Sequence, residues 1–437
     1  MLEVLRIAKE QGLEADLFVQ KVWSTHIEYE AGMFKGCTTE ERMGCGLRVI
    51  RSDRRLGFYA FTPPFTPQEV VERALEVSAW GEPVEFPLPS YPSTTEWKDF
   101  VDVRLENITV QEMVELGSYL LEHLRTTHPD VLVNVSITVG EEERALYNHH
   151  EEDIRFRRTF FRISAEAFRV QEDDILTVYA ERSWGNRDID VEDLLREIQV
   201  KLDLAARVVS VPSGQYPVLF TPQGCMVFLH PLLYGLNGRN IVFGKSPLRD
   251  KFGKVLFSSL FSLLEAPREP WALGSCPFDD EGILTPGERV LVEKGRLEDG
   301  FWDLWSASKA HRKTTASGFR RSPWELPEPS FSVLKVKNGL RDRETLVEEI
   351  EEGLVVDSLL GLGQSNVASG AFSCGVQLGF YVKGGEIQGR VKNVMISGNA
   401  YDALKNIKEI SRDFQWVQGS MLIPYVLVEP IQVDAAK

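Results

Sequence analysis

The sequence predicts an α+β protein, with helices packed on an antiparallel sheet in its first half and a mostly antiparallel β domain in its second. Up to about residue 185, segments with helical periodicity stand beside segments that alternate as strands do. Beyond residue 215 most segments look like strands, and glycines recur inside them. Glycine within a strand is typical of bulges and strong coiling. We therefore expect a curved, barrel-like sheet in the second half.

The first half has clear signals for where its elements begin. Pro67 and Thr109 each stand at the start of a segment with helical periodicity. In the N-terminal helix, Leu2, Leu5 and Ile7 are expected near the core. The expected elements are a helix at the N-terminus, strands at 17–22 and 25–29, a hairpin of 45–50 with 56–61, helices at 67–80 and 110–123, strands at 131–139, 143–147, 154–168 and 175–182, and a helix over 191–208.

Pro212-Ser213-Gly214 ends the last of these helices and indicates a domain boundary. We therefore divide the chain into an N-terminal α+β domain, residues 1–212, and a C-terminal β-rich domain, residues 213–437.

The second half opens with a strand over 217–220. Thr221 then supplies a helix-capping hydroxyl and Pro222 suits the first helical position, so a helix is expected to run from there to Asn237-Gly238. The remaining expected elements are a short helix over 305–310 and strands at 289–293, 296–301, 331–336, 353–360, 372–382, 386–397 and 420–428.

The helix after Thr221 contains the sequence HPLLYG. A zinc peptidase helix needs a histidine, a glutamate as general base and a second histidine about one turn later. Here His230 fills the first position and Pro231 the place of the base, while Tyr234 and Gly235 occupy the places open to a second ligand. On these residues alone, a core helix with one histidine and a peptidase remnant both remain open.

Two other candidate sites have weaker support in the sequence. The acids of Asp279-Asp280-Glu281 could bind a divalent cation, but a tight turn with side chains bonded to the local backbone is favoured. Cys374, between Ser373 and Gly375, is typical of a buried thiol. One thiolate and one imidazole supply half of a tetrahedral zinc shell.

Composition narrows the classes of function. A net charge of -16 over 437 residues disfavours direct contact with nucleic acid. Five scattered cysteines without a CxxC pair favour reduced thiols in the cytoplasm. No apolar run reaches the length of a membrane span, and no secretion signal is apparent, so we expect a cytoplasmic protein without a membrane partner.

Four segments taken in order carry a resemblance to a known family. They are HPLLYGLNG, GKSPLRDKFGK, CPFDDEG followed by LVEKGRLEDGFWDLWSASKA, and GLGQSNVASGAFSCGVQLGFYVKGGEIQGRVKNVMISGN. This order resembles the TldD/PmbA family, long labelled modulators of DNA gyrase. The TldD-like branch resembles zinc metallopeptidases with HExxxH on this helix and a downstream cysteine as third ligand. The PmbA-like branch, also called TldE, lacks that motif and pairs with a TldD-like chain.

The resemblance implies a PmbA/TldE-like subunit that is catalytically inactive alone and completes the peptide channel of a TldD-like zinc metallopeptidase. No metal is then expected here beyond the remnants His230 and Cys374, and zinc belongs to the partner. The implied peptide-channel residues are His230, Tyr234, Ser373, Cys374 and Gly375. The implied partners are a TldD-like chain in a heterodimer, a second copy of this chain when that partner is absent, and a peptide.

Two alternatives stay open. One is a metallopeptidase in its own right, using His230, Cys374 and a third ligand such as His311. The other is a modulator of DNA gyrase that acts without proteolysis.

Overall fold

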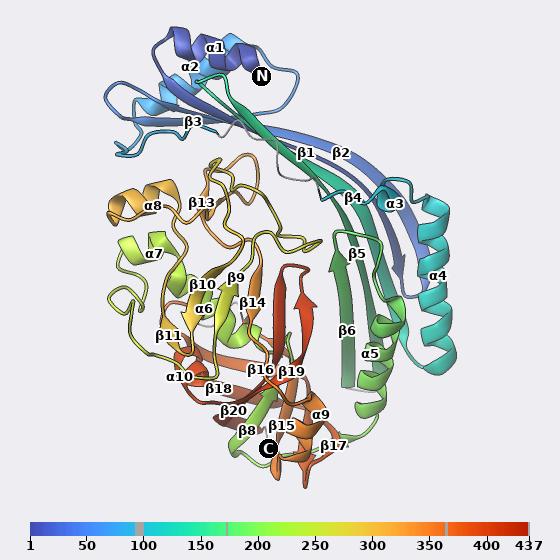
Figure 1. Ribbon diagram of the computed structural model, residues 1–437. Helices are drawn as coiled ribbons and strands as arrows, with labels where there is room; N and C mark the ends of the chain where they lie inside the picture. The colour runs from blue at the N-terminus through green and yellow to red at the C-terminus, as the bar shows by residue number, and fades with distance from the viewer. Residues whose placement is uncertain (92–99, 172–173, 363–365, 436–437) are drawn as a thin grey trace.

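The computed structural model describes residues 1–437 except 92–99, 172–173, 363–365 and 436–437. A long antiparallel sheet formed by the N-terminal half arches beside a C-terminal half that is mostly strand (Figure 1). The α+β class expected from the sequence is therefore confirmed.

The N-terminal sheet has six strands in the described residues, in the order β3-β2-β1-β4-β5-β6, and each neighbouring pair is antiparallel. Their bounds are β1 Glu14–Glu30, β2 Met33–Ile50, β3 Leu56–Phe61, β4 Leu132–Asn148, β5 Asp153–Gln171 and β6 Asp174–Trp184. The hairpin of 45–50 with 56–61 is confirmed, because Ile50 pairs with Leu56.

Two predicted strand breaks in this sheet are wrong. The segments 17–22 and 25–29 form the single strand β1, because β2 and β4 pair with it continuously from both sides through Ser24. The segments 131–139 and 143–147 are likewise joined in β4 through Gly140. A Cβ at Gly140 would lie 2.3 Å from the Trp23 carbonyl oxygen, so glycine here permits close strand approach and does not end the strand.

Helices cover parts of this sheet (Figure 1). They are α1 Leu2–Glu10, α2 Pro67–Ser78, α3 Val103–Glu106, α4 Val110–Thr127 and α5 Val191–Leu204. Leu5 is buried as expected, but Leu2 is 66% exposed, because the buried face of α1 runs through Val4, Leu5 and Ala8. Helix α5 ends at Leu204, before the expected residue 208, because Val208–Val209 forms β7 and pairs in parallel with β17.

In the described part of the C-terminal half, five strands close into a barrel. The ring runs β8-β15-β16-β18-β20 and back to β8, through one parallel and four antiparallel pairings. The bounds are β8 Gly214–Phe220, β15 Glu352–Leu360, β16 Ala371–Lys383, β18 Val394–Asn399 and β20 Met421–Ala435. The barrel-like curvature predicted from the glycine pattern is confirmed.

Further elements surround the barrel. They are α6 Met226–Leu236, α7 Gly238–Val242, α8 Leu304–Lys309, α9 Arg343–Glu348, α10 Ala400–Lys405, β9 Leu263–Glu265, β10 Arg289–Glu293, β11 Arg296–Leu297, β12 Gly318–Phe319, β13 Glu328–Pro329, β14 Leu334–Val336, β17 Glu386–Val391 and β19 Ile407–Val417. The predicted strand 386–397 is two strands, because Asn393 takes a φ of 57° and lets β18 leave β17 to pair with β20.

Buried ion pairs join the two halves. Arg48 in β2 is 2% exposed and contacts Asp16 on its own sheet and Glu281 in the C-terminal half, the latter at 2.8 Å. Arg144 in β4 contacts Asp280 at 2.9 Å. The orientation of the N-terminal sheet is therefore fixed by charges that water does not screen.

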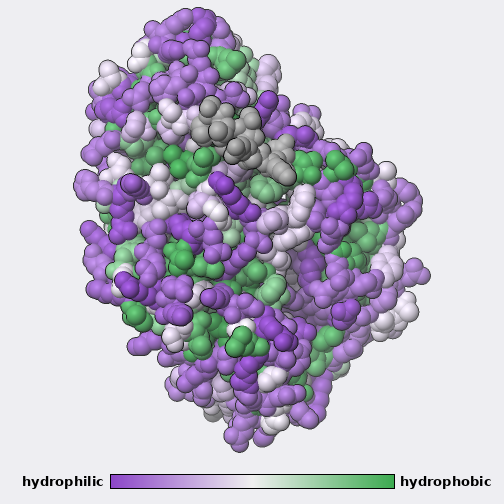
Figure 2. Space-filling view, in the orientation of Figure 1, coloured by the Kyte–Doolittle hydropathy of each residue, from purple (hydrophilic) through white to green (hydrophobic). Residues whose placement is uncertain are grey.

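Hydrophilic side chains cover much of the visible face, with hydrophobic ones scattered between them (Figure 2). Among the described residues, no helix is both long and apolar enough to cross a membrane.

Candidate functional site

Helix α6 packs on the barrel, and its apolar residues, including Phe228, Leu229 and Leu232, belong to the barrel core. The helix begins at Met226, later than the expected Pro222, because residues 221–225 form a turn in which the Thr221 hydroxyl accepts from the Gly224 amide at 3.2 Å. It ends at Leu236. Asn237 then caps the next helix, α7, by accepting from the amides of Arg239 and Asn240.

Pro231 lies inside α6 and has no N–H to offer the preceding turn. Its carbonyl oxygen accepts a hydrogen bond of 2.9 Å from the Tyr401 hydroxyl of α10. The ring cannot accept a proton, so this position cannot supply a general base.

Gly235 lies where a second imidazole would be needed. A Cβ there would lie 2.8 Å from the Tyr401 hydroxyl and 2.9 Å from Leu248. The Gly235 carbonyl also accepts from the Ser246 hydroxyl at 2.5 Å, which fixes the backbone against that loop. There is no space for a histidine side chain at this position without displacing α10 or the loop.

The residues expected in a peptide channel differ in how far they are exposed to solvent. His230 and Ser373 are exposed, and Tyr234 is half-buried at the edge of a cleft of about 460 Å³. Although the side chain is exposed, the protein atoms around it partly desolvate the ring, which lowers the pKa of His230 below its usual value and favours the neutral form. Cys374 is 1% exposed and points into the barrel core, whereas Gly375 beside it is half-buried.

The residues present do not fit a zinc ion on α6. Within the described ranges, no group of three or more His, Cys, Asp or Glu side chains is arranged to hold a metal. His311, the third ligand considered above, is exposed in the turn that follows α8. Tyr401 and Leu248 fill the space that a second imidazole would need.

The acidic segment 279–281 is the tight turn favoured from the sequence. Asp279 is fully buried, and it accepts from the amides of Glu281, Ile283 and Gly318 at 2.9–3.1 Å. Asp280 and Glu281 are each bonded to an arginine of the N-terminal sheet. These carboxylates therefore serve the junction between the two halves.

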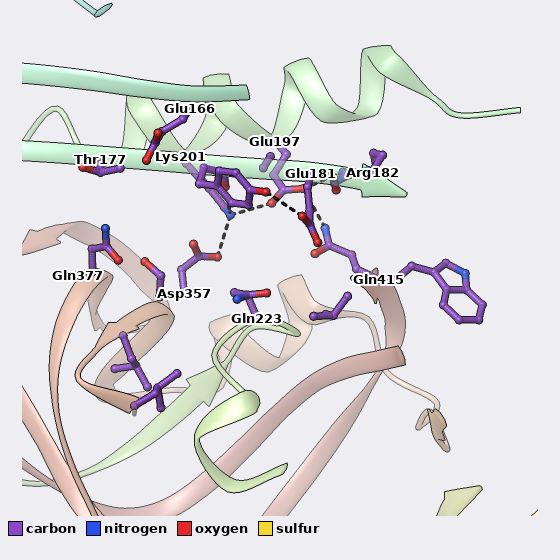
Figure 3. A pocket seen from close by; sticks show the side chains of 17 residues that line it. Glu166, Thr177, Glu181, Arg182, Glu197, Lys201, Gln223, Asp357, Gln377 and Gln415 are labelled. Atoms are coloured by element: carbon purple, nitrogen blue, oxygen red, sulfur yellow. Dashed lines mark hydrogen bonds and ion pairs between the residues drawn. The ribbon is translucent and has the colours of Figure 1, made fainter. Parts of the chain in front are cut away.

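A polar cavity of about 260 Å³ lies between the N-terminal sheet, α5 and the barrel (Figure 3). Lys201 of α5 reaches across one side of it and contacts Glu197 at 2.7 Å and Asp357 of β15 at 2.9 Å. Burial alone would lower the pKa of Lys201, but the two carboxylates outweigh it and raise the pKa above its usual value.

Sequence reasoning missed this cavity. Its lining comes from β5, β6, α5, β15, β16 and β19, which lie far apart along the chain. The available signal was local: Tyr179 and Glu181 place polar groups on one face of β6, while Val178 and Ala180 on the other face are buried under helices.

Most of the chain matches three domains of one known protein family. Residues 15–78 match domain 1 of the PmbA/TldA metallopeptidases, residues 104–210 match the central domain, and residues 213–435 match the C-terminal domain.

Individual relatives are distant in sequence. An uncharacterised protein of Methanocaldococcus jannaschii is 24% identical over 434 residues, which is 97% of each chain. The metalloprotease PmbA of Escherichia coli O157:H7 is 28% identical over 244 residues, covering 54% of this chain and 51% of that protein.

Solved structures share the fold. TldE from Thermococcus kodakarensis has a TM-score of 0.91 at 23% identity and covers all of both chains. A Thermotoga maritima protein whose name refers to modulation of a DNA gyrase has a TM-score of 0.88 at 22% identity, covering 99% of this chain and 98% of that one. Because the C-terminal domain match alone spans more than half of the residues and the other two cover most of the remainder, this chain belongs to the PmbA/TldA metallopeptidase family.

Proposed function

We propose that this protein is a PmbA/TldE-like subunit that does not hydrolyse peptides alone and that completes the peptide channel of a TldD-like zinc metallopeptidase. The observation that carries the proposal is the structure of α6. Pro231 supplies no base, and Tyr401 and Leu248 occupy the space of a second imidazole at Gly235. In this proposal zinc and the general base belong to the partner chain.

The exposed residues around α6 support a role in holding a peptide. His230 and Ser373 are solvent-exposed, and Tyr234 borders the cleft of about 460 Å³ together with Phe243, Phe301 and Phe331. Aromatic side chains beside a cleft give a peptide apolar contact. An extended peptide also needs main-chain partners, and a β-rich surface offers them.

The test compares the isolated chain with the chain mixed with an HExxxH-containing family member. We expect no stoichiometric zinc and no cleavage of an unfolded peptide by the isolated chain. We expect one complex in size-exclusion chromatography, and cleavage only by the mixture. As a control, Glu→Gln in the partner's HExxxH should abolish cleavage without abolishing the complex.

Metal analysis of His230→Ala separates this proposal from a metallopeptidase that acts alone. If His230 and Cys374 held a catalytic zinc, the wild type would contain one zinc per chain and His230→Ala would lose it. That result, with cleavage by the isolated wild type, would refute the subunit role. Equal and low zinc contents are expected for the two proteins.

A further inference from the structure

A strongly basic surface lies beside the cleft of about 460 Å³ near α6. It consists of residues 245–254, which follow α7, and residues 309–313, which begin at the last residue of α8. These two segments contain seven lysines and arginines and one carboxylate, Asp250, in a chain whose net charge is -16. We call them the basic face. Its charge is opposite to that of the chain as a whole.

The two segments of the basic face are in contact with each other. The guanidinium group of Arg312 lies 4.7 Å from the ring centroid of Phe252 and 5.1 Å from that of Trp302. Helices α7 and α8 lie side by side on one flank of the C-terminal half (Figure 1). All seven cations are exposed. They therefore form one positive surface in the folded chain.

Most of this positive charge is not neutralised by the protein itself. In the part of the chain that the structure describes, only Arg312 of the seven cations forms an ion pair, with Asp299 at 4.0 Å. A cluster of like charges without counter-charges raises the local concentration of anions and speeds their association. The basic face is thus suited to attract a negatively charged ligand.

Lys245 connects the basic face to the cleft, because it also lines the cleft wall. Its ammonium group lies 5.5 Å from the ring centroid of Phe243, which is 59% exposed. The other charged groups of the wall are already paired: Glu328 contacts Arg239 at 3.1 Å and Arg321 at 2.9 Å. Lys245 therefore places an uncompensated positive charge beside the aromatic part of the cleft.

We propose that the cleft and the basic face bind an acidic peptide segment, with an apolar side chain among the aromatic rings and a neighbouring carboxylate on Lys245. Phe243, Phe301 and Phe331 supply apolar contact for the first, and an ammonium group gives the second a charge-assisted hydrogen bond. This inference names the substrate class for the peptide-holding role proposed above and rests on that role.

A peptide fits this surface better than a nucleic acid does. The cleft is a concave space with apolar rings, which suits one or two side chains of an extended segment. A polyphosphate would meet Glu328 in the cleft wall and the acidic remainder of the chain beyond the basic face.

Isothermal titration calorimetry on the isolated chain tests the inference with four probes. They are acetyl-Phe-Glu-Glu-Phe-amide, its neutral counterpart acetyl-Phe-Gln-Gln-Phe-amide, acetyl-Phe-Gln-Gln-Phe with a free terminal carboxylate, and a single-stranded oligothymidylate. We expect the glutamate peptide to bind more tightly than the neutral amide. Its affinity should fall as ionic strength rises from about 0.05 to about 0.3 M, because exposed charges are screened.

Lys245→Met is the main variant, because it removes the charge and keeps the length of the side chain. We expect it to weaken binding of the glutamate peptide about tenfold, the loss of one charge-assisted hydrogen bond. Lys383→Met is the matched control: it removes one exposed charge from the end of β16, outside both segments of the basic face, and affinity should not change. An unchanged thermal transition shows that each variant is folded.

Each outcome decides the inference. Preference for the glutamate peptide assigns Lys245 to an acidic side chain, and preference for the free-acid peptide alone assigns it to a terminal carboxylate; both support carboxylate recognition. Equal affinity for the glutamate peptide and the neutral amide, equal affinity of wild type and Lys245→Met, or tighter binding of the oligothymidylate than of either carboxylate peptide would overturn it.

These results are separable from the test of the subunit role. Calorimetry uses this chain alone, whereas the subunit role is judged by complex formation and cleavage with an HExxxH-containing chain. A mixture that cleaves peptides without any preference for carboxylates overturns only the substrate class. Binding of the glutamate peptide through Lys245, with no complex and no cleavage in the mixture, overturns only the subunit role.

Discussion

At the scale of single residues, Gly235 is the position on α6 where an added side chain would meet Tyr401 and Leu248. Tyr401 supports α6 twice, through its hydrogen bond to the Pro231 carbonyl and through its contact with the face that Gly235 leaves open. A side chain at Gly235 therefore has to displace a hydrogen-bonded tyrosine.

We expect Gly235→Ala to lower the free energy of unfolding by about 1–3 kcal/mol, the usual cost of overpacking. Urea denaturation measures it. Gly287→Ala is the control, because Gly287 is exposed and a Cβ there meets nothing within 4 Å. Equal stability of the two variants would show that α10 moves aside without cost.

Because of Glu142, we expect the folded protein to lose stability in acid. It is 5% exposed; burial alone would raise its pKa, but Arg144 and Arg158 outweigh this effect and lower the pKa below its usual value. Because the folded pKa lies below the unfolded one, its stabilising contribution is complete above about pH 4.5 and is lost as the pH falls through the folded pKa.

The measurement is the free energy of unfolding from about pH 7 to about pH 3 for wild type and Glu142→Gln. The wild type should lose more stability than the variant below about pH 4.5. Glu281 contributes with the opposite sign, since burial raises its pKa to about 7, but it is present in both proteins and cancels in the difference. Parallel curves would contradict the assignment.

The environment of a single residue could be predicted where its partners are close in the sequence. Asp279 was expected to bond to its own turn and does so, because the amides of Glu281 and Ile283 lie within reach of its side chain. Cys374 was expected to be a buried thiol and is 1% exposed, whereas placing His230 at the surface required knowing which face of α6 the barrel covers.

At the scale of elements, α4 shows how strongly a short sequence can define a boundary. Thr109 accepts from the Glu112 amide, and the Glu112 side chain accepts from the Thr109 amide at 2.8 Å, which is a capping box. The start of α4 at Val110 was predicted correctly for this reason.

We expect Thr109→Ala to cost about 1 kcal/mol, the usual value for a lost N-cap. Hydrogen exchange should speed up at the first turn of α4 and leave the last turn unchanged. Thr126→Ala, at the other end of the helix, is the control, because its hydroxyl donates only to a carbonyl of the preceding turn. Faster exchange along all of α4 would contradict this prediction, because it would show that the cap stabilises the whole helix and not only its first turn.

Strand lengths were harder to predict. Trp23, Ser24 and Gly140 look like interruptions, yet pairing on both sides carries β1 and β4 through them. The two-residue strand β7 was missed because its pairing with β17 joins segments about 180 residues apart. Local patterns predicted which elements exist, whereas long-range pairing set where they end.

At the scale of the whole molecule, Arg48 connects the two halves through a buried contact. Replacing it by methionine leaves Asp16 and Glu281 without their cation, and we expect a loss of about 3–5 kcal/mol. Differential scanning calorimetry measures it. Arg6→Met is the control, since Arg6 also pairs with two carboxylates but is exposed on α1, and we expect little change. A small effect of Arg48→Met would mean that the junction relies on other contacts.

The α+β class and the barrel could be predicted from the sequence, because the balance of helix and strand signals and the glycine pattern are local properties. The interdomain cavity could not be predicted. Glu166 and Asp357 have no common pattern, and only the way the sheet arches beside the barrel brings them together.

The ring of barrel strands also limits when the C-terminal half can fold during synthesis. Strand β8 pairs on one side with β15 and on the other with β20, so Phe220 depends on Val426, about 200 residues later. A nascent chain therefore exposes the apolar edge of β8 until residues 421–435 have left the ribosome. We therefore expect this strand to need protection by chaperones during synthesis, and we expect shortening of β20 to leave it open to aggregation.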